Sequence, residues 1–279
     1  MEQHSGTGGT SAPGPGESTR AAAPPAAPGH GPGDGSFVLD LVEHGGAVRG
    51  EPQSLDNRLF LQLQVFTDCT APAAAVEAVR ASGLEAVVYA NLNDPRGIGV
   101  LVMSEDPETF AGPARQLLLG DPFCRCTFLP AYTMIGRTYG LGRERDLQDW
   151  ILHKPRRNAL NPTLPWAVWY PLRREGAFNR LPRAEQGRMM AEHAQIGMAY
   201  GEAGAATDIR LECHGLDRDD NEFVLGLLGS RLYPLSKLVK DMRPTRQTSE
   251  FIAKMGPFFV GRVLYQAPLA EKSRGGASG

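Results

Sequence analysis

Residues 164–201, LPWAVWYPLRREGAFNRLPRAEQGRMMAEHAQIGMAYG, contain the two patterns that decide the fold. The stretch 164–174 is rich in apolar and aromatic residues and predicts a strand. The stretch 181–201 carries apolar residues at helical spacing, and Pro182 suits the first turn of a helix. A strand followed by a helix is therefore the unit from which we expect this part of the chain to be built.

The same kinds of segment continue on both sides of this unit. Downstream we expect strands at 208–216 and 222–229, a helix at 232–245 and a strand at 258–265. Upstream we expect strands at 58–66, 84–92, 97–104 and 124–132, and helices at 72–83 and 106–120, the latter capped by Asp106. The order strand, helix, strand, strand, helix, strand thus occurs twice, which is the ferredoxin-like pattern.

This repetition predicts an α+β fold in which two ferredoxin-like βαββαβ halves pack face to face or close into a dimeric α+β barrel. Such a barrel can enclose a ligand beneath a helix. We expect a disordered arm at 1–55, rich in Gly, Pro and Ala, because it lacks apolar periodicity. The halves are then 56–150 and 165–267, joined by a linker at 151–164 and followed by a flexible tail at 268–279.

The composition narrows the class of protein. The chain has 279 residues, 42% of them hydrophobic, and a formal net charge of −2, which gives no electrostatic footprint for nucleic acid or an anionic membrane. Its apolar runs are too short to span a bilayer, and its N-terminus lacks a signal-peptide pattern, so we expect a cytoplasmic protein. The four cysteines include no C-x-x-C pair, and we interpret 124–126 (CRC) as one face of a strand rather than a zinc site.

His193 lies on the apolar stripe of the 181–201 helix, together with Met189, Ile196 and Tyr200. It is either a hydrogen-bonded core histidine or a ligand. A neutral imidazole is a good axial ligand for haem iron, and its other nitrogen usually needs an acceptor. Glu222 is one candidate acceptor, although it could equally be an exposed carboxylate at a hairpin end.

The strand at 164–174 brings aromatic rings (Trp166, Trp169, Tyr170) next to Arg173 and Arg174. Such rings can bound a flat macrocycle and arginines can bind carboxylates, but the same residues also suit a strand end with solvated arginines. On the following strand, polar side chains alternate onto one face, which is either solvent-exposed or the lining of a polar cavity: Asp208, Arg210, Glu212 and His214.

Four segments, WYPLRREGAFNRLPRAEQGRMMAEHAQIG (169–197), HGLDRDDNEFV (214–224), LVKDMRPT (238–245) and GPFFVG (256–261), resemble the chlorite dismutase family, and within it the coproheme decarboxylases. The resemblance covers about residues 56–267. It implies two ferredoxin-like halves per subunit, usually in a homopentamer, with haem in the C-terminal half.

The resemblance also implies roles for residues. His193 is expected to be the proximal iron ligand, Tyr170 the tyrosine that becomes a radical beside the reactive propionate, and Arg174 the arginine typical of the actinobacterial branch. His153 lies at the spacing of a distal base, or else is an ordinary linker histidine. The remaining cofactor-binding candidates are Trp169, Arg156 or Arg157 with Asn158, Arg243 with Ser249, and Asp208 with Arg210.

Two departures from the family pattern matter. Asp208 stands where chlorite dismutases carry a distal arginine, which puts chlorite decomposition in doubt unless Arg210, on the same face, takes that part. Phe178 stands where a tryptophan is usual.

The resemblance to the coproheme decarboxylases implies peroxide-dependent decarboxylation of coproheme, in two rounds, to haem b. The alternatives are a chlorite dismutase or peroxidase that keeps haem b, and a non-catalytic haem-binding protein. Expected partners are coproheme, hydrogen peroxide, further copies of the chain and, transiently, a ferrochelatase.

Overall fold

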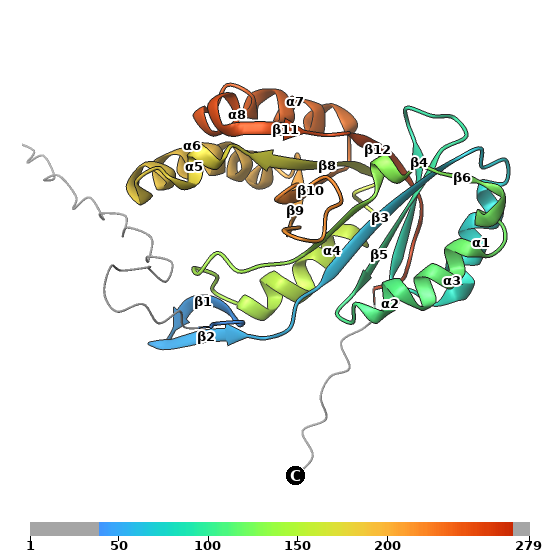
Figure 1. The fold of residues 1–279 in the computed structure, drawn as a ribbon, viewed down its shortest axis with the longest axis horizontal. Helices are drawn as coiled ribbons and strands as arrows, with labels where there is room; N and C mark the ends of the chain where they lie inside the picture. Colours follow the sequence, from blue (N-terminus) through green and yellow to red (C-terminus); the bar gives the residue numbers. More distant parts are fainter. Residues whose placement is uncertain (1–38, 270–279) are drawn as a thin grey trace, which may run out of the picture.

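In the computed structural model, which describes residues 39–269, antiparallel strands are hydrogen-bonded in a closed ring (Figure 1). Around the ring the order is β10, β9, β7, β3, β5, β4, β12 and β8, and β8 pairs back with β10. The strands of the ring are β3 Phe60–Thr67, β4 Ala86–Asn91, β5 Ile98–Ser104, β7 Met134–Arg137, β8 Trp166–Arg174, β9 Thr207–Glu212, β10 Phe223–Gly229 and β12 Phe259–Gln266. The short strands β6 Thr127–Phe128 and β11 Ile252–Met255 attach to β3 and β8.

The ring divides into two halves with the same topology. The first half has the strand order β7-β3-β5-β4, and the second has β12-β8-β10-β9. In each half the strand that comes first in sequence is paired with the strands that come third and fourth, which is the ferredoxin-like arrangement. The predicted α+β fold of two such halves is confirmed.

The side chains of each strand alternate between the inside of the barrel and the helix-covered outside. The inside is filled by large apolar residues, among them Leu61, Leu63, Leu101, Met103, Trp169 and Phe259. On the outside, α1 Pro72–Ser82 and α3 Pro113–Leu119 cover the first half, whereas α6 Arg183–Glu202 and α7 Leu232–Met242 cover the second (Figure 1). Each half therefore has its own apolar layer between sheet and helices, in addition to the shared interior.

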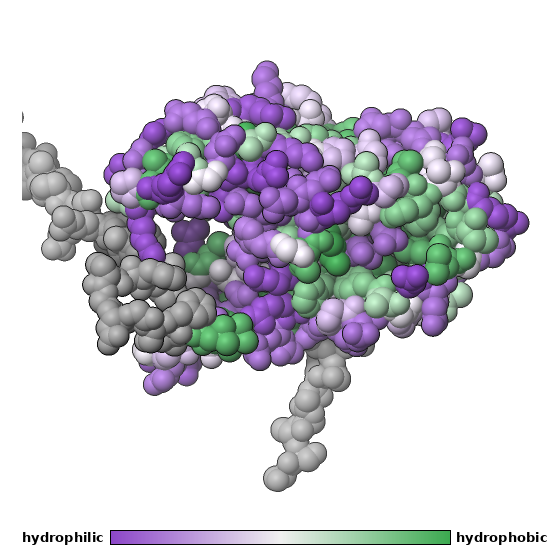
Figure 2. Space-filling view, viewed as in Figure 1, coloured by the Kyte–Doolittle hydropathy of each residue, from purple (hydrophilic) through white to green (hydrophobic). Residues whose placement is uncertain are grey.

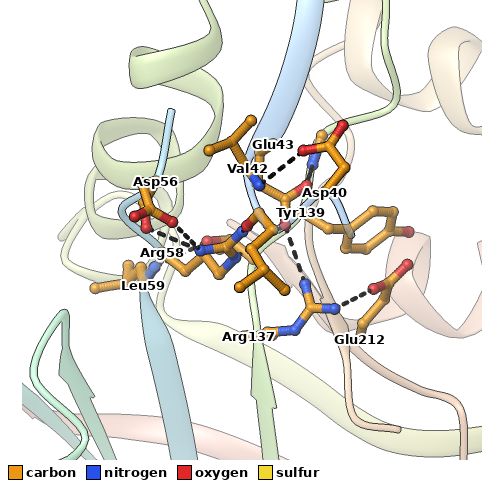
Figure 3. Close-up of polar contacts among 12 residues, drawn as sticks. Asp40, Val42, Glu43, Asp56, Arg58, Leu59, Arg137, Tyr139 and Glu212 are labelled. Atoms are coloured by element: carbon orange, nitrogen blue, oxygen red, sulfur yellow. Dashed lines mark hydrogen bonds and ion pairs between the residues drawn. The ribbon is translucent and has the colours of Figure 1, made fainter. Parts of the chain in front are cut away.

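The two joins between the halves are unequal. β4 and β12 pair over most of their length, whereas β7 and β9 pair only at Arg137 and Glu212. Side chains reinforce this weaker join, because Arg137 donates to Glu212 at 2.9 Å and to Glu43 at 3.2 Å (Figure 3). Glu43 also accepts from Arg58 at 3.0 Å and from the backbone N–H of Gly140 at 2.9 Å.

Glu43 belongs to a hairpin, β1 Glu43–Val48 and β2 Glu51–Leu55, in a segment for which the sequence predicts disorder. Gln53 fastens this hairpin to the rest of the molecule: its Nε2 donates to the Glu144 carbonyl at 2.7 Å, and its Oε1 accepts from Leu147 N–H at 3.0 Å. Distant partners, rather than local periodicity, thus order residues 43–55. The predicted disorder of 1–38 and the predicted tail from 270 onward lie outside the described residues.

Other boundaries also differ from the prediction. The 124–132 strand is wrong: two 3₁₀ turns, Phe123–Arg125 and Pro130–Tyr132, flank β6, and β7 is the fourth strand of the half. Cys126 is paired with Cys69 in a disulfide instead of lying on a strand face. The 106–120 helix is divided into α2 Glu108–Ala111 and α3, because Pro113 cannot donate a helical hydrogen bond.

Helices also replace expected loops. The predicted linker contains a π-helical turn, Asp149–His153, followed by α4 Lys154–Ala159. The remaining short helices are α5 Gly176–Asn179 and α8 Arg246–Phe251, the latter beyond the end of α7. Within residues 39–269, no helix has the length and apolar character needed to cross a membrane.

The contact between Trp169 and Gly226 gives a test of barrel packing. The two residues face each other on β8 and β10, and a Cβ on Gly226 would lie 2.4 Å from the Trp169 ring. Gly226→Ala is expected to lower the free energy of unfolding by about 1–3 kcal/mol, the usual cost of overpacking, as measured by urea denaturation. The control is Gly187→Ala on α6, where nothing lies within 4 Å and a gain of about 0.5–1 kcal/mol is expected. Equal stabilities of the two variants would contradict the packing.

Candidate functional site

The outer face of β8 carries Tyr170, which is buried beneath the helices with 8% of its surface exposed. Its ring stacks on Phe258 with the centroids 4.6 Å apart and 26° between the planes. Burial, together with the negative charge of Asp208, raises the pKa of Tyr170 to about 12, while Arg243 and Arg210 oppose this shift. Tyr170 therefore keeps its hydroxyl proton over the whole physiological pH range.

His193 faces the same layer from α6. It lies one turn after Met189, the one residue of this helix that is fully buried, and one turn before Ile196, which packs against the cluster that contains Tyr170. Its Nδ1 atom is buried and has no hydrogen-bond partner. Burial lowers the pKa of His193, and Arg210 lowers it further, while Asp208 and Glu192 act in the opposite direction. The ring is thus a neutral imidazole with an unsatisfied nitrogen.

β9 contributes a charged pair to this layer, because its outward residues alternate with Ile209 and Leu211 of the barrel interior. Arg210 Nε lies 2.5 Å from Asp208 Oδ2, and each side chain is about one-third exposed, at 36% and 28%. Both charges act on Tyr170 and on His193. The Asp208–Arg210 pair therefore influences the pKa of both the phenol and the imidazole.

A cavity opens beside this pair. It is lined by Thr138, Tyr139, Trp150, Lys154, Pro155, Asp208, Ile209 and Arg210. The Lys154 ammonium lies 4.2 Å from the centroid of the Trp150 ring, and burial lowers the pKa of Lys154. Burial also raises the pKa of Tyr139 to about 12. Tyr139 lies beside Glu212 (Figure 3), and Figure 2 shows this side of the molecule hollowed between α5–α6 and the β1–β2 hairpin.

Arg174 closes the other side of the layer at the end of β8. Its Nε donates to Glu222 at 2.9 Å, and its guanidinium carbon lies 4.8 Å from the Phe178 ring centroid and 4.7 Å from that of Phe223. A planar guanidinium held between two rings and paired with a carboxylate is well fixed in position. The outer face of β8–β10 and the inner face of α6 thus form one layer that combines a neutral imidazole, a protonated phenol and paired charges.

The segment that contains these site residues resembles known proteins. Residues 152–264 match the family model described as chlorite dismutase. This segment belongs to the chlorite dismutase family. It contains His153, Tyr170, His193, Asp208 and Arg210, and it extends from the π-helical turn into β12.

Solved structures share the fold over both halves. A haem-binding protein from Thermus thermophilus is 20% identical, with a TM-score of 0.59 over 75% of this chain and 92% of that one. The candidate chlorite dismutase TA0507 is 14% identical, with a TM-score of 0.60 over 76% and 96%. A mutant of chlorite dismutase from Candidatus Nitrospira defluvii is 14% identical, with a TM-score of 0.56 over 74% and 90%. At these identities the likeness establishes the fold, and among curated proteins none matches the chain.

Within this chlorite dismutase-family fold, the structure separates two neighbours that the sequence analysis grouped together. Trp169 lies inside the barrel with 0% exposure, on the opposite side of β8 from Tyr170. The prediction that Trp169 contacts a cofactor is therefore contradicted, because adjacent residues of a strand point to opposite faces. Neither alternative for Glu222 holds: it does not accept from His193, whose Nδ1 has no partner, and it is not an exposed carboxylate, since it is bound by Arg174 and its side chain is only 17% exposed.

The three residues expected to hold propionates from α4 point in different directions. Arg156 donates from Nε to Glu85 at 2.9 Å and from Nη1 to Glu105 at 3.1 Å, both carboxylates of the first half. Arg157 pairs with Asp149 at 2.6 Å on the surface. Asn158 alone reaches β9, where its Nδ2 donates to the carbonyl of Asp208 at 3.1 Å. Of these three residues, Asn158 is therefore the one that contacts β9, the strand that carries Asp208 and Arg210.

The segment after α7 also rearranges the expected set. The charge of Arg243 acts on Tyr170. Ser249, in contrast, is exposed, and its hydroxyl donates to the Thr245 carbonyl at 3.0 Å within α8. Gln247 and Thr248 are the buried polar residues of this helix.

The distal candidates lie at the junction of the π-helical turn and α4. His153 is half-buried as the last residue of the turn, whereas the next residue, Lys154, lines the cavity with Asp208 and Arg210. Sequence reasoning missed both Lys154 and Tyr139. Lys154 directly follows the candidate base His153 in the sequence. Its place in the cavity, however, depends on α4, which replaces the expected linker.

The raised pKa of Tyr170 can be measured directly. When the native protein is brought from pH 8 to pH 10.5, Tyr170→Phe is expected to show the same phenolate absorbance change as the wild type, because Tyr170 stays protonated until about pH 12. The control is Tyr233→Phe, which removes a phenol that is 73% exposed and keeps Tyr170. A reduced change in Tyr170→Phe would show that Tyr170 is solvated.

Proposed function

We propose that this protein is a haem-dependent oxidoreductase that uses hydrogen peroxide to decarboxylate two propionates of coproheme and produces haem b. The proposal rests on one observation. A neutral His193 imidazole and a buried, protonated Tyr170 phenol both lie between α6 and the outer face of the sheet. The chlorite dismutase family match and the haem-binding relative support an iron porphyrin in this layer.

His193 fits the role of iron ligand. Its pKa is lowered, so the imidazole is available in the neutral form that binds metals, and its buried Nδ1 atom shows that the ring is not a satisfied core histidine. Among the described residues no group of three or more His, Cys, Asp or Glu side chains could hold a metal ion. A single protein ligand suits an iron whose four equatorial ligands come from a porphyrin.

Tyr170 fits the role of the group that takes a hydrogen atom from the substrate. It stays protonated at neutral pH, and its stacking on Phe258 fixes the direction of the hydroxyl. When bound, the iron porphyrin supplies the oxidising equivalent that removes an electron and a proton from this phenol. Each round then consumes one peroxide and one proton, and converts a propionate to a vinyl group with release of carbon dioxide and two waters.

Cations around the layer suit a substrate with several carboxylates. Arg243 acts electrostatically on Tyr170, and Lys154 lines the same cavity as Asp208. Arginine and lysine bind carboxylates strongly in partly dehydrated sites. Because Arg210 is already paired with Asp208 at 2.5 Å, it is poorly suited to bind chlorite alone, which favours the decarboxylase over the chlorite dismutase alternative.

The principal test loads the purified protein with ferric coproheme, adds hydrogen peroxide stepwise and follows the porphyrin by mass spectrometry. Stepwise loss of two carboxyl groups is expected for the wild type and for Tyr233→Phe, an exposed control. Tyr170→Phe is expected to bind coproheme but not to decarboxylate it. Full decarboxylation by Tyr170→Phe would refute the radical role. Bleached or unchanged coproheme in the wild type would refute the reaction, and haem b with chlorite would be tested next.

The junction of the π-helical turn and α4 provides a second test. We propose that His153 accepts the proton of peroxide, because histidine is the side chain that most often transfers protons in catalysis, whereas Lys154, which lines the cavity with Asp208 and Arg210, holds a carboxylate of the substrate. His153→Gln should lower the decarboxylation rate at pH 7 by about 10²–10⁴-fold with little change in coproheme affinity. Lys154→Met should weaken coproheme binding instead. The reverse pattern, measured by stopped-flow kinetics and by titration, would exchange the two roles.

Assembly into a homopentamer and transient contact with a ferrochelatase stay predictions from the family resemblance. The mass of the native assembly in solution and pull-down with a ferrochelatase are the corresponding measurements.

A further inference from the structure

Arg156 connects α4 to the first half of the barrel. Its Nε donates to both carboxylate oxygens of Glu85 at 2.9 Å, and its Nη1 donates to Glu105 at 3.1 Å. The Arg156 side chain is only 18% exposed, so these charge-assisted hydrogen bonds lie in a partly dehydrated contact. A helix that carries residues of the proposed site is therefore bound directly to the sheet of the other half.

The two carboxylates that receive Arg156 are themselves well fixed. Glu85 directly precedes β4, Glu105 directly follows β5, and these two strands are paired with each other. The backbone N–H of Met103 also donates to the Glu85 carbonyl at 2.9 Å. Both carboxylates thus belong to the same end of one strand pair in the closed ring, and this strand pair gives the guanidinium a rigid support.

The same guanidinium also binds the π-helical turn, Asp149–His153. Nη1 of Arg156 donates to the backbone carbonyl of Leu152 at 2.9 Å. This carbonyl belongs to the residue immediately before His153 and two residues before Lys154. One side chain therefore joins two carboxylates of the first half to the turn from which the cavity-lining residue Lys154 follows.

The other end of α4 is bound to the second half. Asn158 Nδ2 donates to the carbonyl of Asp208 on β9 at 3.1 Å. Gln266 of β12 donates from Nε2 to the carbonyl of Ala159 at 2.8 Å. The helix is thus held at both ends, and Arg156 provides the contact at the end that is nearer to the turn.

Lys154 depends on the position of this turn. It lines the cavity with Asp208 and Arg210, and its ammonium lies 4.2 Å from the centroid of the Trp150 ring. Trp150 belongs to the same turn, and its indole N–H donates to the Tyr139 carbonyl at 3.0 Å. A shift of the turn would therefore move the ammonium and the ring beneath it together.

We propose that Arg156 is a positioning residue of the site: it fixes the π-helical turn against the first half of the barrel and thereby holds Lys154 in the cavity. Arg156 does not itself bind a carboxylate of the substrate, because its donors are already used within the protein. The planar guanidinium suits this role, since Nε and Nη1 donate in different directions, which a compact lysine ammonium does not reproduce. The role of Lys154 as a carboxylate ligand rests on the proposed function.

The first test uses the ligand-free protein and measures hydrogen–deuterium exchange of amides 149–160 by mass spectrometry. Arg156→Met is expected to accelerate this exchange by about 10–100-fold, because the charge-assisted hydrogen bonds that hold the turn are lost. Arg156→Lys, which keeps the charge but not the geometry, should give a smaller acceleration. The control is Arg125→Met, which removes an exposed arginine paired with Asp121 and should exchange as wild type does. Equal exchange in Arg156→Met and Arg125→Met would overturn the proposal.

The second test is a double-mutant cycle on the affinity for ferric coproheme, measured by absorbance titration. Arg156→Met is expected to weaken binding by about 10-fold in the wild-type background and by less than about 2-fold in a Lys154→Met background, because Arg156 acts through Lys154. Equal losses in both backgrounds would show that Arg156 acts independently of Lys154, as a direct ligand of a propionate would, and would contradict the positioning role.

The two tests separate this inference from the proposed function. Wild-type protein that binds no coproheme would refute the proposed function, whereas the exchange measurement in ligand-free protein still decides whether Arg156 fixes the turn. If Arg156→Met does not fold, both tests are made with Glu85→Gln, which removes the charge of the acceptor and leaves α4 unchanged. Its matched control is Glu77→Gln, a change at an exposed carboxylate paired with Arg80.

Discussion

Trp169 fills the barrel and Tyr170 faces the helices because successive residues of β8 point to opposite sides of a closed sheet. In an open sheet either face could be exposed to water. Here the ring of strands makes the inner face a shared core, so every chemically active side chain of the second half has to lie on the outer face, under α6. Tyr170, Asp208, Arg210 and Arg174 therefore converge without any loop to bring them together.

The same arrangement explains why the charges of the site are paired within the protein. Arg210 is bound to Asp208 and Arg174 to Glu222, and each pair lies at the edge of the buried layer rather than in its centre. A buried cation without a partner is costly, so these carboxylates stabilise the arginines in the protein alone. An anionic ligand must then share or displace a carboxylate, which favours ligands that offer several carboxylates at once.

Much of this architecture is predictable from the sequence, and the exceptions have physical causes. The element order predicts both ferredoxin-like halves, because apolar periodicity reports directly on burial. Trp169 is misplaced when its aromatic character is weighed above the alternation of the strand. Hairpin 43–55 and Lys154 could not be located, because each depends on contacts between distant segments: Gln53 with Leu147, and α4 with β9.

The β1–β2 hairpin precedes the residues that match the family, yet it contributes to the closure of the barrel. Glu43 binds Arg58, Arg137 and Gly140 around the join where β7 and β9 share one residue pair, and Gln53 holds the loop that leads to the π-helical turn. A chain that began at β3 would keep both halves of the barrel and every proposed catalytic side chain. It would nevertheless lose the clasp that holds the two halves together beside the cavity, so the functional unit of this protein begins upstream of its recognisable domain.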